Sequence, residues 1–98
     1  MKTELYIFVC DSTEDRSRCP FSKYVENFTP VDGMKVEDAA FQGAESDVEV
    51  KDIVIVFDKE GKVLQRIELE NHVCRDTHDF DKTLQQYKDN GWEEVEDA

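Results

Sequence analysis

Five side chains that can bind a metal or carry thiol chemistry fall in two short windows of this 98-residue chain. The first window, "CDSTEDRSRCP", contains Cys10 and Cys19, and the second, "NHVCRDTH", contains His72, Cys74 and His78. Cysteine and histidine are the usual ligands of structural zinc, which takes four of them in a tetrahedral arrangement. The five residues are therefore a candidate zinc site that would join the two windows.

The spacing of these residues also fits unrelated roles. Paired zinc ligands are commonly separated by two to four residues, whereas the windows have the forms C-x8-C and H-x-C-x3-H. On this alternative interpretation Cys10 and Cys74 are small buried residues. The two histidines, His72 and His78, are then solvated residues of a loop and of a first helical turn.

The chain is strongly acidic, with 24 Asp and Glu residues against 12 Lys and Arg and a formal net charge of −12. Such a charge repels phosphates, so we expect no direct binding to nucleic acid or to a membrane. It suits a basic protein partner, although it also serves solubility alone. Carboxylates are dense between residues 37 and 52, where we expect the partner-binding residues to be Glu37, Asp38, Glu45, Asp47, Glu49 and Asp52.

Length and hydropathy indicate one soluble domain that spans residues 1–98. No segment reaches the roughly 20 apolar residues of a transmembrane helix. The apolar run "LYIFVC" is too short and too closely flanked by acids for a signal peptide. We therefore expect a cytoplasmic protein, in which three cysteines do not form a disulfide framework.

Two uninterrupted apolar runs, "LYIFV" (5–9) and "IVIVF" (53–57), predict strands covered on both faces inside a sheet. The second run is followed by "DKEGK", a turn signal, and by the alternating segment "VLQRIELE" (63–70). These segments predict an antiparallel hairpin whose second strand lies nearer the edge of the sheet.

Two helices are predicted. In "CPFSKYVENF", the apolar side chains of Phe21, Tyr24, Val25 and Phe28 have helical spacing, and Pro20 suits a first helical position. The segment "THDFDKTLQQYKDNG" (77–91) has an apolar face and closes on Asn90-Gly91.

Two other segments are less regular. Between residues 31 and 52, "MKV" and "DVEV" are strand-like, and "VEDAAFQGAE" fits a short helix or a loop. The end, "WEEVEDA", predicts a short strand or a docked tail with Trp92 and Val95 facing inward.

These elements predict a small single α/β domain with a central mixed sheet and helices packed on it. The order β-α-β-ββ-α, together with "CPFS" (19–22), resembles thioredoxin-like and glutaredoxin-like domains. The resemblance implies that Cys19 is the nucleophile of a one-thiol active site, with Ser22 in place of a second cysteine. The stretch before "IVIVF" is "VKDI" and lacks the proline that the family places there.

Three functions are compatible with these features. The first is a small acidic protein-binding module, such as an inhibitor or adaptor that engages a basic protein surface as a nucleic-acid mimic does. The second is a one-thiol thioredoxin-like oxidoreductase that uses Cys19. The third is a structural domain stabilised by zinc.

Overall fold

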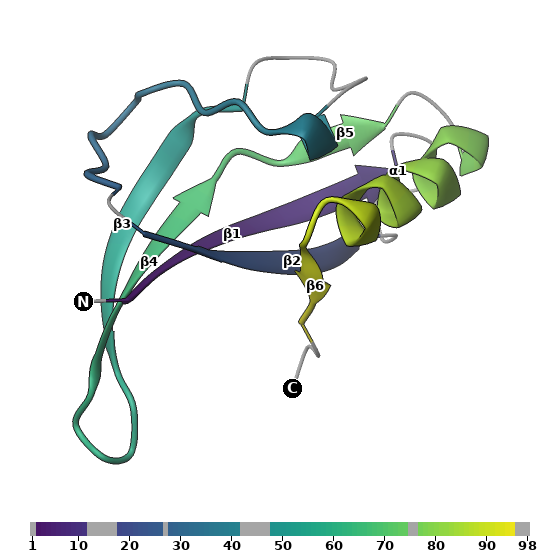
Figure 1. Cartoon of the computed structure of the whole chain (residues 1–98). Coiled ribbons are helices and arrows are strands. Elements are labelled where there is room, and N and C mark those ends of the chain that lie inside the picture. Colours follow the sequence, from purple (N-terminus) through teal and green to yellow (C-terminus); the bar gives the residue numbers. More distant parts are fainter. Residues whose placement is uncertain (1, 12–17, 27, 42–47, 75–76, 96–98) are drawn as a thin grey trace.

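Strand β1 (Lys2–Asp11) runs through the middle of the molecule and has neighbouring strands along both edges (Figure 1). The computed structural model describes residues 2–11, 18–26, 28–41, 48–74 and 77–95, without the side chains of residues 2 and 77–79. The elements in chain order are β1 (Lys2–Asp11), β2 (Arg18–Val25), the 3-10 turn η1 (Ala39–Phe41), β3 (Val50–Phe57), β4 (Val63–Leu69), β5 (His72–Cys74), α1 (Thr77–Asp89) and β6 (Glu93–Glu94).

The six strands form one mixed sheet in the order β3-β4-β1-β2-β6, with β5 also bonded to β1. Strand β2 pairs antiparallel with one edge of β1. The other edge pairs parallel with two strands in succession, since β4 follows residues 2–6 of β1 and β5 follows residues 9–11. A single α/β domain with a mixed sheet is therefore confirmed, but the described residues contain only one α-helix.

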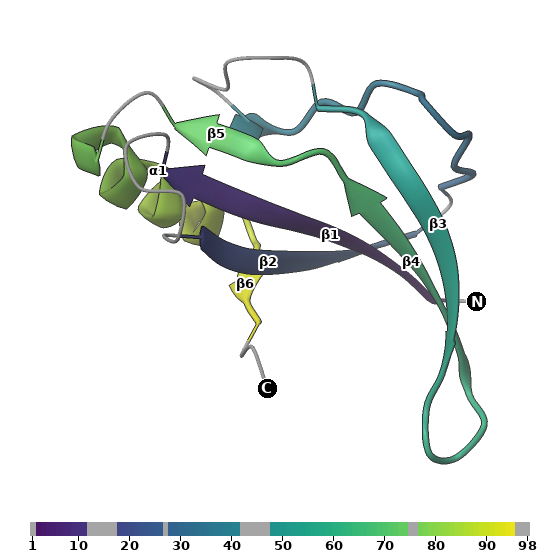
Figure 2. The same ribbon diagram turned by 180° about the vertical axis from the view of Figure 1, so that it is seen from behind.

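Helix α1 lies against one face of the sheet, as the two opposite views show (Figures 1 and 2). Alternate residues of β1 point to that face and form the core, because successive strand residues point to opposite faces. Leu5, Ile7 and Val9 are almost or completely inaccessible to solvent, and so is Tyr87 of α1. The predicted central strand 5–9 and the predicted second helix are both confirmed.

On the face away from α1, arginine side chains cover the aromatic rings of β1. The Arg66 guanidinium lies 4.9 Å from the ring centroid of Tyr6, and the Arg18 guanidinium lies 4.8 Å from that of Phe8. Arg66 is held there by Glu4, whose Oε1 accepts a hydrogen bond from Nε at 2.6 Å. These cation–π contacts shield the rings and leave the charges near water.

The predicted helix over "CPFSKYVENF" is wrong, because residues 18–25 form strand β2. The spacing of the apolar residues in this segment also fits a strand in which Tyr24 faces solvent. Tyr24 is 50% exposed, whereas Phe21 is buried on the face of the sheet that α1 covers. Pro20 is tolerated on the outer edge of β2, where its carbonyl accepts a hydrogen bond from the Val95 amide at 2.9 Å. The N–H that proline lacks would have pointed to that same edge.

The predicted position of "IVIVF" is also wrong. The antiparallel hairpin of β3 and β4 is present, but β3 is the edge strand and β4 lies between β3 and β1. Ile53, Val54, Ile55 and Phe57 are exposed, so the apolar residues of β3 are not covered on both faces. An unbroken apolar run indicates a strand whose two faces are both buried. It does not indicate whether the residues that bury those faces belong to the same chain or to another protein.

The segment between β2 and β3 contains little regular structure. The predicted strands "MKV" and "DVEV" contribute one antiparallel bridge, between Lys35 and Glu49. Within "VEDAAFQGAE" the described part holds only the 3-10 turn η1. The predicted order β-α-β-ββ-α is not confirmed, since a strand follows β1. No helix in the described ranges is both long and apolar enough to cross a membrane.

Helix α1 ends in a Schellman motif that delivers Trp92 to the core. The Trp92 amide donates to the Tyr87 carbonyl at 3.0 Å, and the Gly91 amide donates to the Lys88 carbonyl at 3.3 Å. Gly91 has a φ of +87°, a backbone region that side chains with a Cβ rarely adopt. Trp92 is buried directly after this turn, and β6 follows it at the edge of β2.

We expect Gly91→Ala to lower the free energy of unfolding by about 1 kcal/mol, because alanine is strained at this φ. Gly91→Asn, which tolerates the left-handed region better, should cost less. Chemical denaturation of both variants measures the difference. Equal stability of wild type and Gly91→Ala would show that the turn does not constrain the end of α1.

Candidate functional site

The two cysteine and histidine windows do meet at one end of the sheet. Strand β5 lies directly beside the end of β1, with Val9 opposite His72 and Asp11 opposite Cys74. On the other edge of β1, Val9 lies opposite Cys19. The backbones of the windows are thus neighbours although more than 50 residues separate them in sequence.

The candidate zinc ligands whose side chains the structure describes do not converge at this end. Cys10 points to the opposite face from Val9 and its partners, because adjacent strand residues alternate. Cys19 and His72 share a face, but β1 lies between their strands and separates them by roughly 10 Å, too far for ligands that must lie within about 2.3 Å of one ion. Among the described side chains no three of His, Cys, Asp and Glu could hold a metal. The side chain of His78 lies outside the described residues.

Cys19 lies in a strand and has no helix N-terminus to stabilise its thiolate. Burial raises the pKa of Cys19 above its ordinary value, and Glu94 raises it further through a hydrogen bond (Sγ to Oε1, 3.4 Å) and its charge. Lys88 opposes this rise with a smaller effect. A thiol held in its protonated form is a poor nucleophile, so this geometry does not favour the oxidoreductase alternative.

We expect Cys19 to react with iodoacetamide at neutral pH more slowly than a free thiol, because little thiolate is present. Glu94→Gln should accelerate the reaction severalfold by removing the opposing charge. Glu93→Gln is the matched control, because Glu93 pairs with Ser22 and points to the other face of the sheet. Mass spectrometry maps the label, and rapid labelling of Cys19 in the wild type would instead support thiol catalysis.

His72 is fully buried in an aromatic cluster beneath α1. Its Nδ1 lies 2.8 Å from the Tyr87 hydroxyl, and its Nε2 has no hydrogen-bond partner among the described residues. The Tyr87 ring also contacts Phe21 and Trp92, at centroid distances of 5.1 and 5.3 Å. Burial lowers the pKa of His72 from 6.5 to about 4, so the ring is neutral at physiological pH. Burial likewise raises the pKa of Tyr87 above its ordinary value.

Stability should fall as the pH is lowered from about 6.5 to 4. In this range the unfolded chain protonates His72 and the folded chain does not, so acid favours unfolding. The full effect is about 3 kcal/mol. We expect His72→Gln to flatten the dependence measured by chemical denaturation between about pH 6.5 and 5, above the range of most carboxylates. His78→Gln, the matched control, should retain it, and an unchanged slope in His72→Gln would contradict the assignment.

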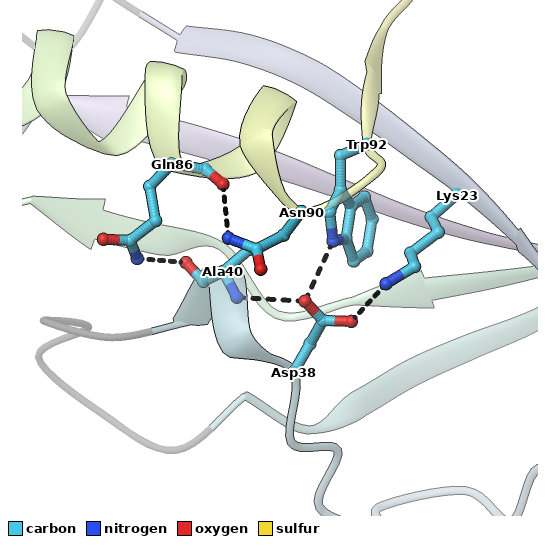
Figure 3. Close-up of polar contacts among 6 residues, drawn as sticks. All are labelled: Lys23, Asp38, Ala40, Gln86, Asn90 and Trp92. Carbon is cyan, nitrogen blue, oxygen red and sulfur yellow. Dashed lines mark hydrogen bonds and ion pairs between the residues drawn. The ribbon is translucent and has the colours of Figure 1, made fainter.

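Asp38, one of the acids predicted to bind a partner, instead joins three segments of the fold (Figure 3). One carboxylate oxygen accepts hydrogen bonds from the Ala40 amide at 3.0 Å and from Trp92 Nε1 at 3.1 Å, and the other accepts from Lys23 Nζ at 2.8 Å. Burial opposes ionisation of Asp38, but these bonds and the Lys23 charge outweigh it and hold the pKa below its ordinary value.

Helix α1 reaches the same network through the side chain of Gln86, and Asn90 bonds back to the last turn of the helix. Gln86 Nε2 donates to the Ala40 carbonyl at 2.8 Å, and Asn90 Nδ2 donates to the Gln86 carbonyl at 2.8 Å (Figure 3). The Gln86 contact ties the 3-10 turn η1 to the helix. Asp38 therefore has a structural role, and its carboxylate is largely closed to a partner.

The other predicted partner-binding acids differ in exposure. Glu37 and Asp52 are exposed and Glu49 is half-buried. Glu45 and Asp47 lie outside the described residues. Glu37 and Asp52 are therefore the described members of this set that are fully open to a partner.

Large apolar side chains of the β3–β4 hairpin are exposed, although the sequence-based prediction had "IVIVF" covered on both faces. We call these side chains the hairpin surface, and their exposed fractions are 40% for Ile53, 37% for Val54, 47% for Ile55, 68% for Phe57 and 38% for Val63. Four of them share one face of the hairpin, with Phe57 opposite Val63, and Val54 lies on the other face. The hairpin projects away from α1 at one edge of the sheet (Figures 1 and 2). Clustered exposure of this kind is typical of protein interaction sites.

Comparison with known proteins adds no relative: no protein-family model, curated protein or solved structure matches the chain.

Proposed function

We propose that this protein is an acidic protein-binding module whose hairpin surface contacts a basic partner protein. The observation that carries the proposal is the exposure of five large apolar side chains on β3 and at the start of β4. Apolar surface is stabilised by removal from water, at about 25 cal/mol per Å². A partner that covers the hairpin surface gains this free energy on binding.

The net charge of −12 supports a basic partner. Charge of one sign over a whole molecule steers a partner of the opposite sign and raises the association rate. The hairpin itself carries exposed residues of both signs, including Asp52 and Glu60 as well as Lys51 and Lys62. We therefore assign the apolar residues to contact and the overall charge to attraction, which fits an adaptor better than a nucleic-acid mimic.

Affinity capture with matched variants tests this function. Phe57→Asp places a charge in the hairpin surface, and Val31→Asp places the same charge at an equally exposed apolar residue elsewhere, with exposed fractions of 68% and 61%. We expect wild type and Val31→Asp to retain the same basic proteins and Phe57→Asp to lose them. For a recovered partner, the association rate should fall at least tenfold between about 50 and 300 mM salt.

Two results would contradict the proposal. One is a partner whose retention is the same with Phe57→Asp and with Val31→Asp, since contact would then lie elsewhere. The other is an association rate that does not respond to salt, since the acidic charge would then have no part in recognition.

A further inference from the structure

The outer edge of β3, the edge not bonded to β4, is unpaired over residues 52–57 within the described part of the chain. Its pairing stops just before that stretch. The Val50 amide donates to the Met34 carbonyl at 2.8 Å, and the Val50 carbonyl accepts from the Gly33 amide at 3.0 Å. Beyond Val50 the register of β3 on β4 shifts at an irregularity, and the five apolar residues 53–57 follow. An edge of this kind can accept a further strand.

A second copy of this chain is one conceivable occupant, and the charges at the ends of β3 oppose it. When a two-fold axis relates two identical antiparallel strands, one residue lies opposite its own copy. Every other pair then joins two odd-numbered or two even-numbered residues, whose side chains share a face. All five apolar residues pair only when Ile55 lies opposite itself. That register places Asp52 opposite Asp58 of the other copy, twice, and brings Lys51 toward Lys59.

Hydrogen bonds within the hairpin turn fix the position of the Asp58 carboxylate that causes this repulsion. The Oδ1 atom of Asp58 accepts hydrogen bonds from the Glu60 amide at 2.9 Å and from the Lys62 amide at 2.8 Å. Its charge is therefore held at the end of the strand and cannot swing away. Like charges directly opposite each other destabilise a strand pair.

The neighbouring symmetric registers are also unfavourable. A shift in one direction places Asp52 opposite Val56 and Phe57 opposite Lys51. A shift in the other direction places Val54 opposite Asp58. Each shift buries a charge against an apolar side chain and reduces the apolar pairing.

We infer that the outer edge of β3 accepts an extended segment of the partner by antiparallel strand addition. The segment that fits has five residues, apolar on at least one face, between two basic residues, which lie opposite Asp52 and Asp58. An acidic residue at each end then lies toward Lys51 and Lys59. This inference rests on the proposed function and names the form in which the partner binds.

Two peptides of identical composition test the charge order. The matched peptide is Glu-Lys-Val-Thr-Val-Thr-Val-Lys-Glu, and the control, Lys-Glu-Val-Thr-Val-Thr-Val-Glu-Lys, exchanges the charges at both ends. Both have no net side-chain charge, so general attraction to an acidic protein does not distinguish them. We expect the matched peptide to bind about tenfold more tightly, with NMR shift changes concentrated in the amides of residues 52–57. Equal binding, or binding elsewhere, would overturn the inference.

Exchange of two neighbouring residues tests the barrier to self-pairing. The double variant Lys51→Asp with Asp52→Lys keeps the net charge at −12 and makes both repulsive pairs attractive. We expect this variant to dimerise in analytical ultracentrifugation, with slowed hydrogen exchange at residues 53–57, and the wild type not to do so. A wild-type dimer protected at these residues would make a second copy the occupant, and a monomeric double variant would show that the end charges do not decide pairing.

The two proposals can fail separately. If Phe57→Asp abolishes capture of a basic partner but neither peptide binds at β3, the binding function stands and strand addition is wrong. If the matched peptide binds at β3 but no basic partner depends on the hairpin surface, the edge accepts a strand and the proposed function is wrong.

Discussion

The backbone pairing of β1 on both edges is the constraint on which the rest of the structure depends. One edge is bonded to β2 and the other is shared by β4 and β5. The alternation of side chains along β1 then fixes two different faces. Leu5, Ile7 and Val9 form the floor of the core under α1, while Tyr6 and Phe8 lie on the other face beneath arginine side chains.

The same pairing explains why the tip of the hairpin surface, Phe57 and Val63, is exposed. Residue Lys2 of β1 lies opposite Leu64 of β4, so the pairing among the described residues ends one residue short of Val63. The Phe57–Val63 pair and the turn beyond it extend past β1 and have no neighbouring strand on that side among the described residues. The apolar residues of the tip are therefore left without the cover that the middle of the sheet receives.

Sequence patterns predicted the elements whose local signal and tertiary environment agree. The central strand, the hairpin and α1 with its closing Gly91 are of this kind. Residues 20–28 are not, because Phe21, Tyr24 and Val25 have a spacing that suits either a helix face or a strand with one exposed residue. Pairing with β1 decides between the two states, and such long-range pairing leaves no local signal.

The candidate site residues were predictable as residue types but not as an arrangement. The windows around Cys19 and His72 do lie side by side, yet β1 separates the side chains. Asp38 looked like one acid among many, and only the fold shows that Trp92 and Lys23 meet at its carboxylate. The signal for the hairpin surface was present in "IVIVF", but a run of apolar residues does not reveal what covers it.

The two ends of the sheet differ in a way that suits binding at an edge. At one end His72, Tyr87 and Trp92 form a closed aromatic cluster, and Asp38 ties η1 to Trp92, which follows α1. At the other end the hairpin stands clear of the core, so an added strand would not need to displace packed side chains. An exposed apolar edge invites aggregation, and charges at its ends are a common protection. In β3 these charges lie outside the apolar residues, so they can oppose a second copy while leaving the edge open to a strand of complementary charge.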